Sequence, residues 1–353
     1  MKSQLRSSWV STLAVVGMYW LFAGQAGAGP TLSTSTESSA RKVAADANSE
    51  KLASAVAAVV RIKSKAIPNA RSLATLGAER EGSGIVVGPN GLVLTIGYLI
   101  VEAESIELED GAGKLVPATA VAYDHGSGFG LIRALTNLGI TPIELGNSGN
   151  LPENESAIFA AAGGIDAASS TTIVSRRRFA GYWEYMIDDA IFTSPPRFDH
   201  SGAALIDRTG ALVGVGSLIV ADAQPSIRRL PGNMFVPIDL LKPILEEMMQ
   251  TGSSRRGKHP WLGITSQEVE GRVFISKVQA DSPAERAGLK QGDILLGVES
   301  TRVSKLEELY SSLWKDRQPG DEVTLTVLQG TEVRKVSVKS MDRTEYMRSK
   351  SKV

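Results

Sequence analysis

The residues best suited to nucleophilic chemistry lie in one short run, from Phe198 to Ile206, where Ser201 follows Asp199 and His200. A serine hydroxyl is a weak nucleophile at its ordinary pKa, so it needs a hydrogen-bonded base that is itself oriented by a third group. His200 is adjacent, but neighbouring side chains in an extended segment point in opposite directions. The base for Ser201 must therefore come from another part of the chain.

The composition excludes several other kinds of chemistry. The chain has no cysteine, and its histidines are His125, His200 and His259, none of which forms a His-x-x-x-His pair. We therefore expect no disulfide, no metal site and no cofactor. Lys plus Arg and Asp plus Glu both total 38, so the formal charge is zero and nothing indicates nucleic-acid binding.

Three segments together resemble the HtrA/Deg family of trypsin-like serine proteases. In the run that contains Ser201, that serine falls on the family's nucleophile. The segment Gly84 to Ile100 resembles the stretch that carries the catalytic histidine, and Tyr98 stands in the histidine position. The segment Tyr123 to Ile132 resembles the stretch that carries the orienting aspartate, where Gly128 now stands. The resemblance thus implies a triad in which two of three positions have lost their chemistry.

The oxyanion-hole positions, Asp199 and His200, also depart from the family pattern. The family has glycine where Asp199 stands, and a carboxylate beside a developing negative charge is electrostatically unfavourable. Tyr98, with an ordinary pKa of about 10, is a poor base at neutral pH. We therefore expect an inactive protease domain. The alternative is an active serine endopeptidase in which Ser201 uses a non-standard base, such as His125 moved inward from its loop.

Short apolar segments separated by turn residues indicate a mainly β fold. Such segments flank Gly88-Pro89-Asn90-Gly91, Asp110 to Gly113 and Asp207 to Gly210. The resemblance narrows this to a trypsin-like double β-barrel over residues 51–250, closed by a helix from Pro237 to Met249. The basic run Arg176 to Arg178 is interpreted as an exposed loop, or alternatively as a grip for an acidic partner. Residues 251–258 are interpreted as a polar linker.

A second, α+β domain over residues 259–342 resembles an HtrA-type PDZ module. The resemblance rests on the run Asp281 to Leu295. Within it Ser282 and Glu285 form a capping box, and Gly288 provides a left-handed stop. A second capping box, Ser304 with Glu307, is expected to open another helix, and residues 343–353 to form a polar tail.

The PDZ resemblance implies a peptide-binding groove. PDZ modules bind an extended C-terminus as an added strand, with the terminal carboxylate held by backbone N–H groups. The resemblance places the carboxylate loop and first strand at Trp261, Leu262, Gly263 and Ile264. The pocket for the last side chain is expected to be lined by Ile264, Leu306, Leu309 and Leu313, which favours an apolar C-terminal residue. Alternatively, these leucines form the domain core and bind no ligand.

The N-terminus resembles a targeting segment. Lys2 and Arg6 precede an apolar stretch from Trp9 to Gly24, and Ala26-Gly27-Ala28 is typical of a cleavage site. We expect a cleaved signal peptide at 1–28, a flexible linker at 29–50 and a periplasmic or secreted protein; an uncleaved membrane anchor is the alternative. The expected partners are polypeptide C-termini or unfolded proteins, with a possible homo-trimer or mixed assembly with an active relative.

Overall fold

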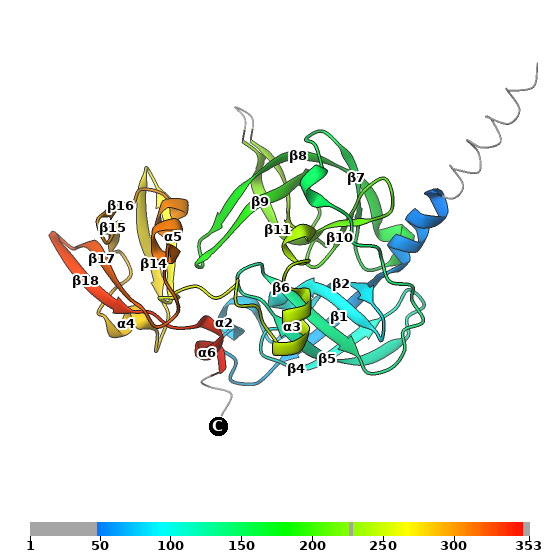
Figure 1. Ribbon diagram of the computed structural model, residues 1–353, viewed down its shortest axis with the longest axis horizontal. Coiled ribbons are helices and arrows are strands. Elements are labelled where there is room, and N and C mark those ends of the chain that lie inside the picture. Colours follow the sequence, from blue (N-terminus) through cyan, green and yellow to red (C-terminus); the bar gives the residue numbers. More distant parts are fainter. Residues whose placement is uncertain (1–47, 226–228, 349–353) are drawn as a thin grey trace, which may run out of the picture. The chain divides into compact units, whose positions relative to one another are not determined.

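A computed structural model describes residues 48–225 and 229–348, all within the compact unit Asp46–Val353 (Figure 1). The predicted signal peptide, and the predicted linker up to residue 47, lie outside the described residues. Residues 48–57 are helical. In the part of the chain that is described, no helix combines the length and apolarity needed to cross a membrane.

The first barrel confirms the strands expected on either side of the early turns. Its strands close in the order β1-β2-β3-β6-β5-β4. At the β2–β3 turn, Asn90 and Gly91 both have positive φ, as a tight hairpin turn requires. The strands are β1 (Val59–Ala66), β2 (Glu79–Gly88), β3 (Leu92–Ile96), β4 (Ala103–Glu109), β5 (Leu115–Tyr123) and β6 (Phe129–Ala134).

A second closed barrel follows, with the order β10-β11-β12-β9-β8-β7. Its long strands β8 and β9 form a hairpin that extends from Thr172 and Ser194 to the turn after Gly181. The strands are β7 (Ser156–Ala160), β8 (Ala168–Gly181), β9 (Tyr185–Ser194), β10 (Ala204–Ile206), β11 (Leu212–Gln224) and β12 (Leu230–Pro237).

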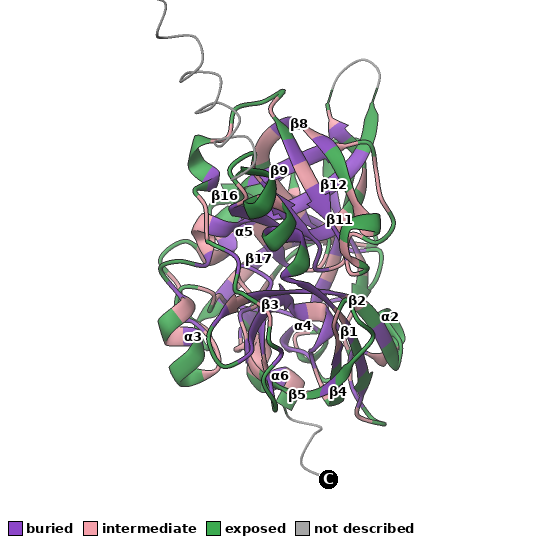
Figure 2. Ribbon diagram, turned by 90° about the vertical axis from the view of Figure 1, so that its right-hand side faces the viewer, coloured by how far each residue is buried: buried purple, intermediate pink, exposed green. Residues whose placement is uncertain are grey.

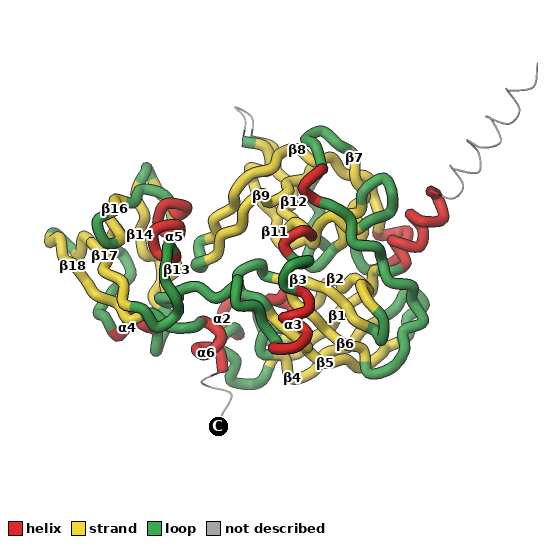
Figure 3. The backbone as a smooth tube through the Cα atoms, viewed as in Figure 1, coloured by secondary structure: helices red, strands yellow, loops and turns green. Residues whose placement is uncertain are grey.

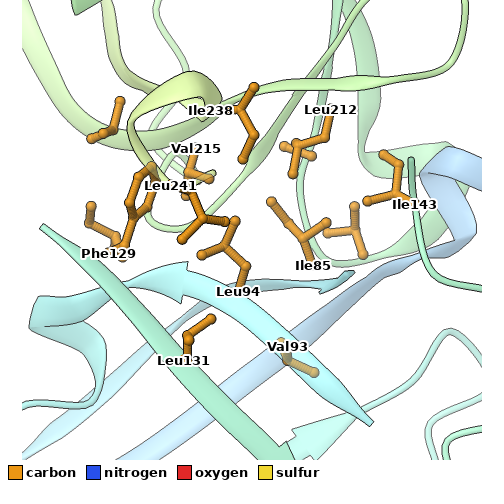
Figure 4. Close-up of a cluster of buried hydrophobic side chains, with 14 of the residues drawn as sticks. Ile85, Val93, Leu94, Phe129, Leu131, Ile143, Leu212, Val215, Ile238 and Leu241 are labelled. Carbon is orange, nitrogen blue, oxygen red and sulfur yellow. The ribbon is translucent and has the colours of Figure 1, made fainter. Parts of the chain in front are cut away.

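The two barrels share one apolar cluster, which fixes their junction. Figure 4 shows Leu94 and Phe129 of the first barrel in the same cluster as Leu212 and Val215 of the second. All four side chains are completely buried. Burying each is worth about 1.5–3 kcal/mol, so the junction is rigid enough to position side chains from both barrels. The buried residues lie mainly on the barrel strands (Figure 2).

Two expectations for this domain were wrong. The basic run lies in strand β8 rather than in a loop, and each arginine pairs with an aspartate: Arg176 with Asp189, Arg177 with Asp222 and Arg178 with Asp188. The closing helix is also shorter than expected. Pro237 ends β12, a 3₁₀ turn covers Ile238–Leu240, and α3 (Leu245–Thr251) begins after Pro243. Proline lacks an N–H and disfavours helical backbone before it, which explains the late start.

The remaining strands form the α+β domain, whose sheet has the order β13-β14-β15-β17-β18 with β16 paired to β15 (Figure 3). Ser282 caps α4 by accepting a hydrogen bond from the Glu285 N–H, and Gly288 has φ +81°, as expected. At α5 the carboxylate that reaches back to Ser304 belongs to Glu308 instead of Glu307. The elements are β13 (Ile264–Val269), β14 (Arg272–Val278), α4 (Pro283–Arg286), β15 (Ile294–Val298), β16 (Thr301–Arg302), α5 (Leu306–Trp314), β17 (Glu322–Gln329) and β18 (Glu332–Lys339).

The segment expected as a linker, and the described part of the expected tail, residues 343–348, make contacts with the rest of the chain. In the linker, Ser254 is buried and donates a hydrogen bond to Asp124 Oδ1 (2.6 Å). The start of the tail forms α6 (Arg343–Arg348), where buried Tyr346 packs on Trp261 with ring centroids 4.4 Å apart. The other short helices are α2 (Leu73–Leu76), η1 (Gly97–Leu99), η2 (Ser148–Asn150) and η3 (Gly164–Ala167).

Candidate functional site

Ser201 lies in the turn between β9 and β10, at the barrel junction. Its carbonyl oxygen accepts a hydrogen bond from the Ser83 N–H of β2 (2.8 Å). The next residue, Gly202, has φ +73°, and a Cβ there would lie 2.0 Å from the Ser83 carbonyl oxygen. Only glycine fits this position. The turn that presents the serine is therefore intact and is fixed to the first barrel.

The hydrogen-bond partner of the Ser201 hydroxyl is Tyr98, which lies on η1. The Tyr98 hydroxyl is 2.9 Å from Ser201 Oγ and 2.8 Å from the Ser217 carbonyl oxygen. Burial raises the pKa of Tyr98 above its ordinary value, and the hydrogen bond with Ser201 acts in the opposite direction. The Tyr98 hydroxyl has a single proton, and the Ser217 carbonyl oxygen can only accept a hydrogen bond. When Tyr98 donates its proton to this carbonyl oxygen, the Ser201 hydroxyl must donate to Tyr98. The pair is a neutral hydroxyl network without a base.

Another side chain lies close to the position of the orienting aspartate. Gly128 has φ +82°, and a Cβ there would lie 3.1 Å from the Tyr185 hydroxyl oxygen. That hydroxyl donates a hydrogen bond to the Ser127 carbonyl oxygen (2.8 Å). The carboxylate of this loop, Asp124, accepts from Ser127 and Ser254 and makes no hydrogen bond with Tyr98. No group here orients a base toward Ser201.

At the oxyanion-hole positions, the carboxylate of Asp199 forms an ion pair with Arg197. Arg197 Nε donates to Asp199 Oδ1 (2.9 Å), and the guanidinium forms a second bond to Oδ2. Burial acts to raise the pKa of Asp199, but the hydrogen bond and charge of Arg197 outweigh it, so the pKa is lowered. The carboxylate is therefore ionised and is directed toward Arg197. His200 Nδ1 lies 3.2 Å from the Arg197 carbonyl oxygen, and this ring makes no hydrogen bond with Ser201.

The other two histidines are placed elsewhere. His125 packs against Tyr123 with ring centroids 4.2 Å apart, and burial followed by the charge of Arg343 holds its pKa well below its usual range. His259 stacks on Trp314 at 4.6 Å. All three histidines lie within the described residues 48–225 and 229–348, and none of the three forms a hydrogen bond with the Ser201 hydroxyl.

The predicted carboxylate loop of the second domain surrounds a carboxylate. The N–H groups of Leu262 (2.8 Å), Gly263 (2.8 Å) and Ile264 (3.0 Å) all donate to the side chain of Glu184. Gly263 has φ +85°, and a Cβ there would lie 2.3 Å from that of Ser282. The loop thus needs glycine to turn its N–H groups toward one point.

The predicted pocket residues divide into two groups. Ile264, Leu309 and Leu313 are buried in the core of the domain, whereas Leu306 packs at the edge of that core. Trp261 is buried and pairs with Met341 through an isolated bridge. Ala180 and Met186 of the β8–β9 hairpin pack against the same cluster, so the burial of Leu309 and Leu313 is compatible both with a pocket lining and with a domain core.

Three residues of the sites were not anticipated: Glu184 and Tyr185 after the turn of the β8–β9 hairpin, and Tyr310 on α5. The aromatic residues around Glu184 were visible in the sequence but carried no signal for its contacts. The one available hint was an acidic residue among aromatic residues, because a carboxylate that is buried there needs hydrogen-bond donors.

Comparisons with known proteins identify both domains. A trypsin-like peptidase domain family matches residues 82–215, and a PDZ domain family matches residues 260–340. The serine protease PepD of Mycobacterium tuberculosis is 28% identical over 297 residues, covering 76% of this chain and 62% of PepD. The serine endoprotease DegS of Haemophilus influenzae is 25% identical over 260 residues, covering 70% of this chain and 73% of DegS.

Other relatives and solved structures extend this agreement. The periplasmic pH-dependent serine endoprotease DegQ of Escherichia coli is 25% identical over 275 residues, covering 73% of this chain and 58% of DegQ. The chain thus spans less than two thirds of the length of PepD and DegQ. The HtrA-type protease AlgW with decapeptide has a TM-score of 0.52 at 17% identity, covering 84% of this chain and 98% of AlgW. That likeness shows the fold alone. With its trypsin-like peptidase domain followed by a PDZ domain, this chain is a homologue of the HtrA-type serine proteases.

Proposed function

We propose that this chain is an HtrA-type homologue that does not cleave peptide bonds and that binds polypeptide C-termini through its PDZ domain. The single observation that carries the loss of catalysis is the partner of Ser201. Its hydroxyl lies 2.9 Å from a tyrosine whose pKa is raised by burial. A proton acceptor is what acylation requires at that point, and a neutral phenol is not one.

The expected loss of rate is large. Removing the base or the nucleophile of a working triad lowers kcat on the order of 10⁶, which corresponds to about 8 kcal/mol of transition-state stabilisation. A functional oxyanion hole retains roughly 10³- to 10⁴-fold catalysis over water. Here Asp199 stands where the family has glycine, and its carboxylate is held by Arg197. The proposed loss of catalysis therefore rests on the missing base.

The case for peptide binding rests on the carboxylate loop. Three consecutive N–H groups converge on one carboxylate, which is the donor arrangement that recognises a C-terminus. The structural neighbour AlgW is described with a decapeptide, which supports peptide binding here by analogy. The strand β13 lies at the edge of its sheet, so it is available in principle for an added strand.

The proposal places the protein in the periplasm. Its support is the predicted signal peptide and the relative DegQ, which is named as periplasmic. In that compartment the protein would shelter or sense misfolded polypeptides, and its protease cleft would be a second peptide site. Alternatively, it would regulate an active relative by mixed assembly. The ligand of the PDZ groove would be a polypeptide with a free, apolar C-terminus.

A serine-reactive probe tests the loss of catalysis. The full chain and its Ser201→Ala variant are treated with a fluorophosphonate probe and, separately, with unfolded casein, alongside an active HtrA-type relative. We expect neither form to be labelled and neither to degrade casein, while the relative does both. Labelling of the unmodified chain that disappears in Ser201→Ala would overturn the proposal and would favour an active endopeptidase with a non-standard base.

A further inference from the structure

The turn of the β8–β9 hairpin is held in the PDZ domain by a buried glutamate. Glu184 is 6% exposed and has φ +53°, an uncommon backbone conformation for a residue with a side chain. Its Oε1 accepts from the Leu262 N–H, and its Oε2 accepts from the N–H groups of Gly263 and Ile264. All three donors of the carboxylate loop are therefore already used within the chain.

The backbone of the same turn pairs with the strand that borders the groove. The Tyr182 carbonyl oxygen accepts a hydrogen bond from the Ser266 N–H of β13 (2.8 Å). Tyr182 precedes Glu184 by two residues, and Ser266 follows Ile264 by two. A peptide added to an edge strand makes the same two kinds of contact, one from its end carboxylate and one from a carbonyl further back. The turn from Tyr182 to Glu184 thus reproduces the contacts of a bound C-terminus.

The helix on the other side of the groove also holds the turn. Tyr310 on α5 is completely buried; its hydroxyl donates to the Gly181 carbonyl oxygen (2.7 Å) and accepts from the Glu184 N–H (3.2 Å). Two side chains of the hairpin, Ala180 and Met186, pack against the core of the PDZ domain. The hairpin turn is consequently bound to both β13 and α5.

The charge of Glu184 is balanced by backbone donors and one nearby cation. Burial raises the pKa of Glu184 to about 7, while the three backbone hydrogen bonds and the charge of Arg343 act to lower it. Arg343 on α6 also donates to the Trp183 carbonyl oxygen (3.3 Å). The titratable and charged groups around Glu184 are Tyr310 on α5, Arg343 on α6, and the cavity-lining residues Asp124, His125, Lys258, His259 and Asp342.

We propose that the turn from Tyr182 to Glu184 is an internal ligand of the PDZ groove, and that a peptide C-terminus binds only after this turn is displaced. The inference rests on the proposed peptide binding. Three N–H groups cannot satisfy two carboxylates at once, so the turn and a peptide compete for the same donors. The apparent affinity for a peptide then equals its intrinsic affinity reduced by the fraction of molecules in which the groove is open.

Removal of the competing carboxylate tests this directly. Full-length protein, Glu184→Ala and Asp188→Ala are titrated against fluorescein-labelled decapeptides with a free valine, leucine or phenylalanine C-terminus, and against the same peptides with an amidated C-terminus. Asp188 lies on the same hairpin with a 71% exposed side chain, so it is the matched control. We expect Glu184→Ala to bind the free-acid peptides at least about tenfold more tightly than the other two proteins, and no protein to bind the amidated peptides.

Hydrogen exchange gives a readout that does not need a peptide. The amides of Leu262, Gly263, Ile264 and Ser266 should exchange faster in Glu184→Ala than in the unmodified protein, with the amides of β17 and β18 unchanged. If Glu184→Ala does not fold, Tyr310→Phe replaces it, because this change removes the two hydrogen bonds on the α5 side and leaves the loop intact. Like Glu184→Ala, Tyr310→Phe should bind the free-acid peptides more tightly than the unmodified protein does.

The outcomes separate the inference from the proposed function. If the unmodified protein and Glu184→Ala bind the free-acid peptides equally, the internal ligand is refuted and peptide binding stands. If neither binds any peptide, the proposed function of the groove fails, and the inference fails with it. If amidated peptides bind as well as free acids, competition for the loop N–H groups is refuted.

Discussion

The barrel junction around Ser201 and the loop from Leu262 to Ile264 differ in the atoms that carry their chemistry. At the junction, catalysis would depend on the side chains at positions 98 and 128, and these are now tyrosine and glycine. In the loop, recognition depends on backbone N–H groups, which substitution of side chains does not remove. A chain can therefore lose side-chain chemistry at one site and keep backbone chemistry at another within the same fold.

One turn nevertheless contributes to both regions. Glu184 fills the carboxylate loop, and the next residue, Tyr185, fills the space beside Gly128. The hydroxyl oxygen of Tyr185 would lie 3.1 Å from a Cβ at position 128, which is a tight contact, and the backbone there has φ +82°. Packing and backbone conformation therefore both disfavour an aspartate at this position, and restoring the lost residue types should not restore the chemistry.

The largest effect at stake is the rate of peptide cleavage. We expect the double variant Tyr98→His, Gly128→Asp to show no turnover above the Ser201→Ala background, a shortfall on the order of 10⁶ relative to a working triad. The physical reason is that a Cβ at Gly128 would lie 3.1 Å from the Tyr185 hydroxyl oxygen, in backbone with φ +82°. Fluorophosphonate labelling and casein cleavage measure the outcome.

A third substitution sharpens this prediction. Tyr185→Phe removes the obstructing oxygen, so the triple variant should be labelled more strongly than the double variant, and Ser201→Ala in the triple background should abolish that labelling. Double and triple variants with equal, Ser201-dependent labelling would show that Tyr185 does not close the site.

The next largest effect concerns the pH dependence of stability. Glu184 has a pKa raised from 4.5 to about 7 by burial, against the opposing hydrogen bonds of the loop. Between these values the folded state binds more protons than the unfolded state, so the contribution of Glu184 to stability is complete below pH 4.5 and is lost as the pH rises through 7. The difference corresponds to about 3 kcal/mol.

Urea unfolding between pH 4.5 and 8 measures this contribution. The stability of the unmodified protein minus that of Glu184→Gln should fall by this amount with rising pH, because glutamine does not titrate. Asp188→Asn is the control on the same hairpin and should leave the curve parallel to that of the unmodified protein. A constant difference between the unmodified protein and Glu184→Gln would show that Glu184 does not titrate in this range.

The sequence was sufficient to predict features that depend on local spacing. The short strands around the early turns, the cap at Ser282 and the left-handed Gly288 follow from residues a few positions apart, whereas the double-barrel and PDZ folds were predicted from the family resemblance. Glu184 could not be predicted, because its partner Leu262 lies 78 residues away and the contact requires two folded domains. The basic run from Arg176 to Arg178 was misread for a similar reason, since each paired aspartate lies on a neighbouring strand or hairpin position that only the fold brings close.

The smallest effect concerns the hydroxyl network at the junction. Tyr98→Phe leaves the buried Ser217 carbonyl oxygen without its 2.8 Å donor and Ser201 Oγ without its 2.9 Å partner. We expect a loss of about 2 kcal/mol in the free energy of unfolding, measured by urea titration. Tyr182→Phe, at a 58% exposed tyrosine, should change stability by less than about 0.5 kcal/mol.

A double-mutant cycle with Ser201→Ala then isolates the contact between the two hydroxyls. If the serine is retained because it completes this network, the two substitutions should be non-additive by about 1 kcal/mol. Strict additivity would mean that Ser201 and Tyr98 do not stabilise each other. Non-additive substitutions in a protein without turnover would show that Ser201 has kept a stabilising hydrogen bond while its proton acceptor was lost. In this respect the barrel junction differs from the PDZ loop, where the backbone N–H groups keep their recognition chemistry.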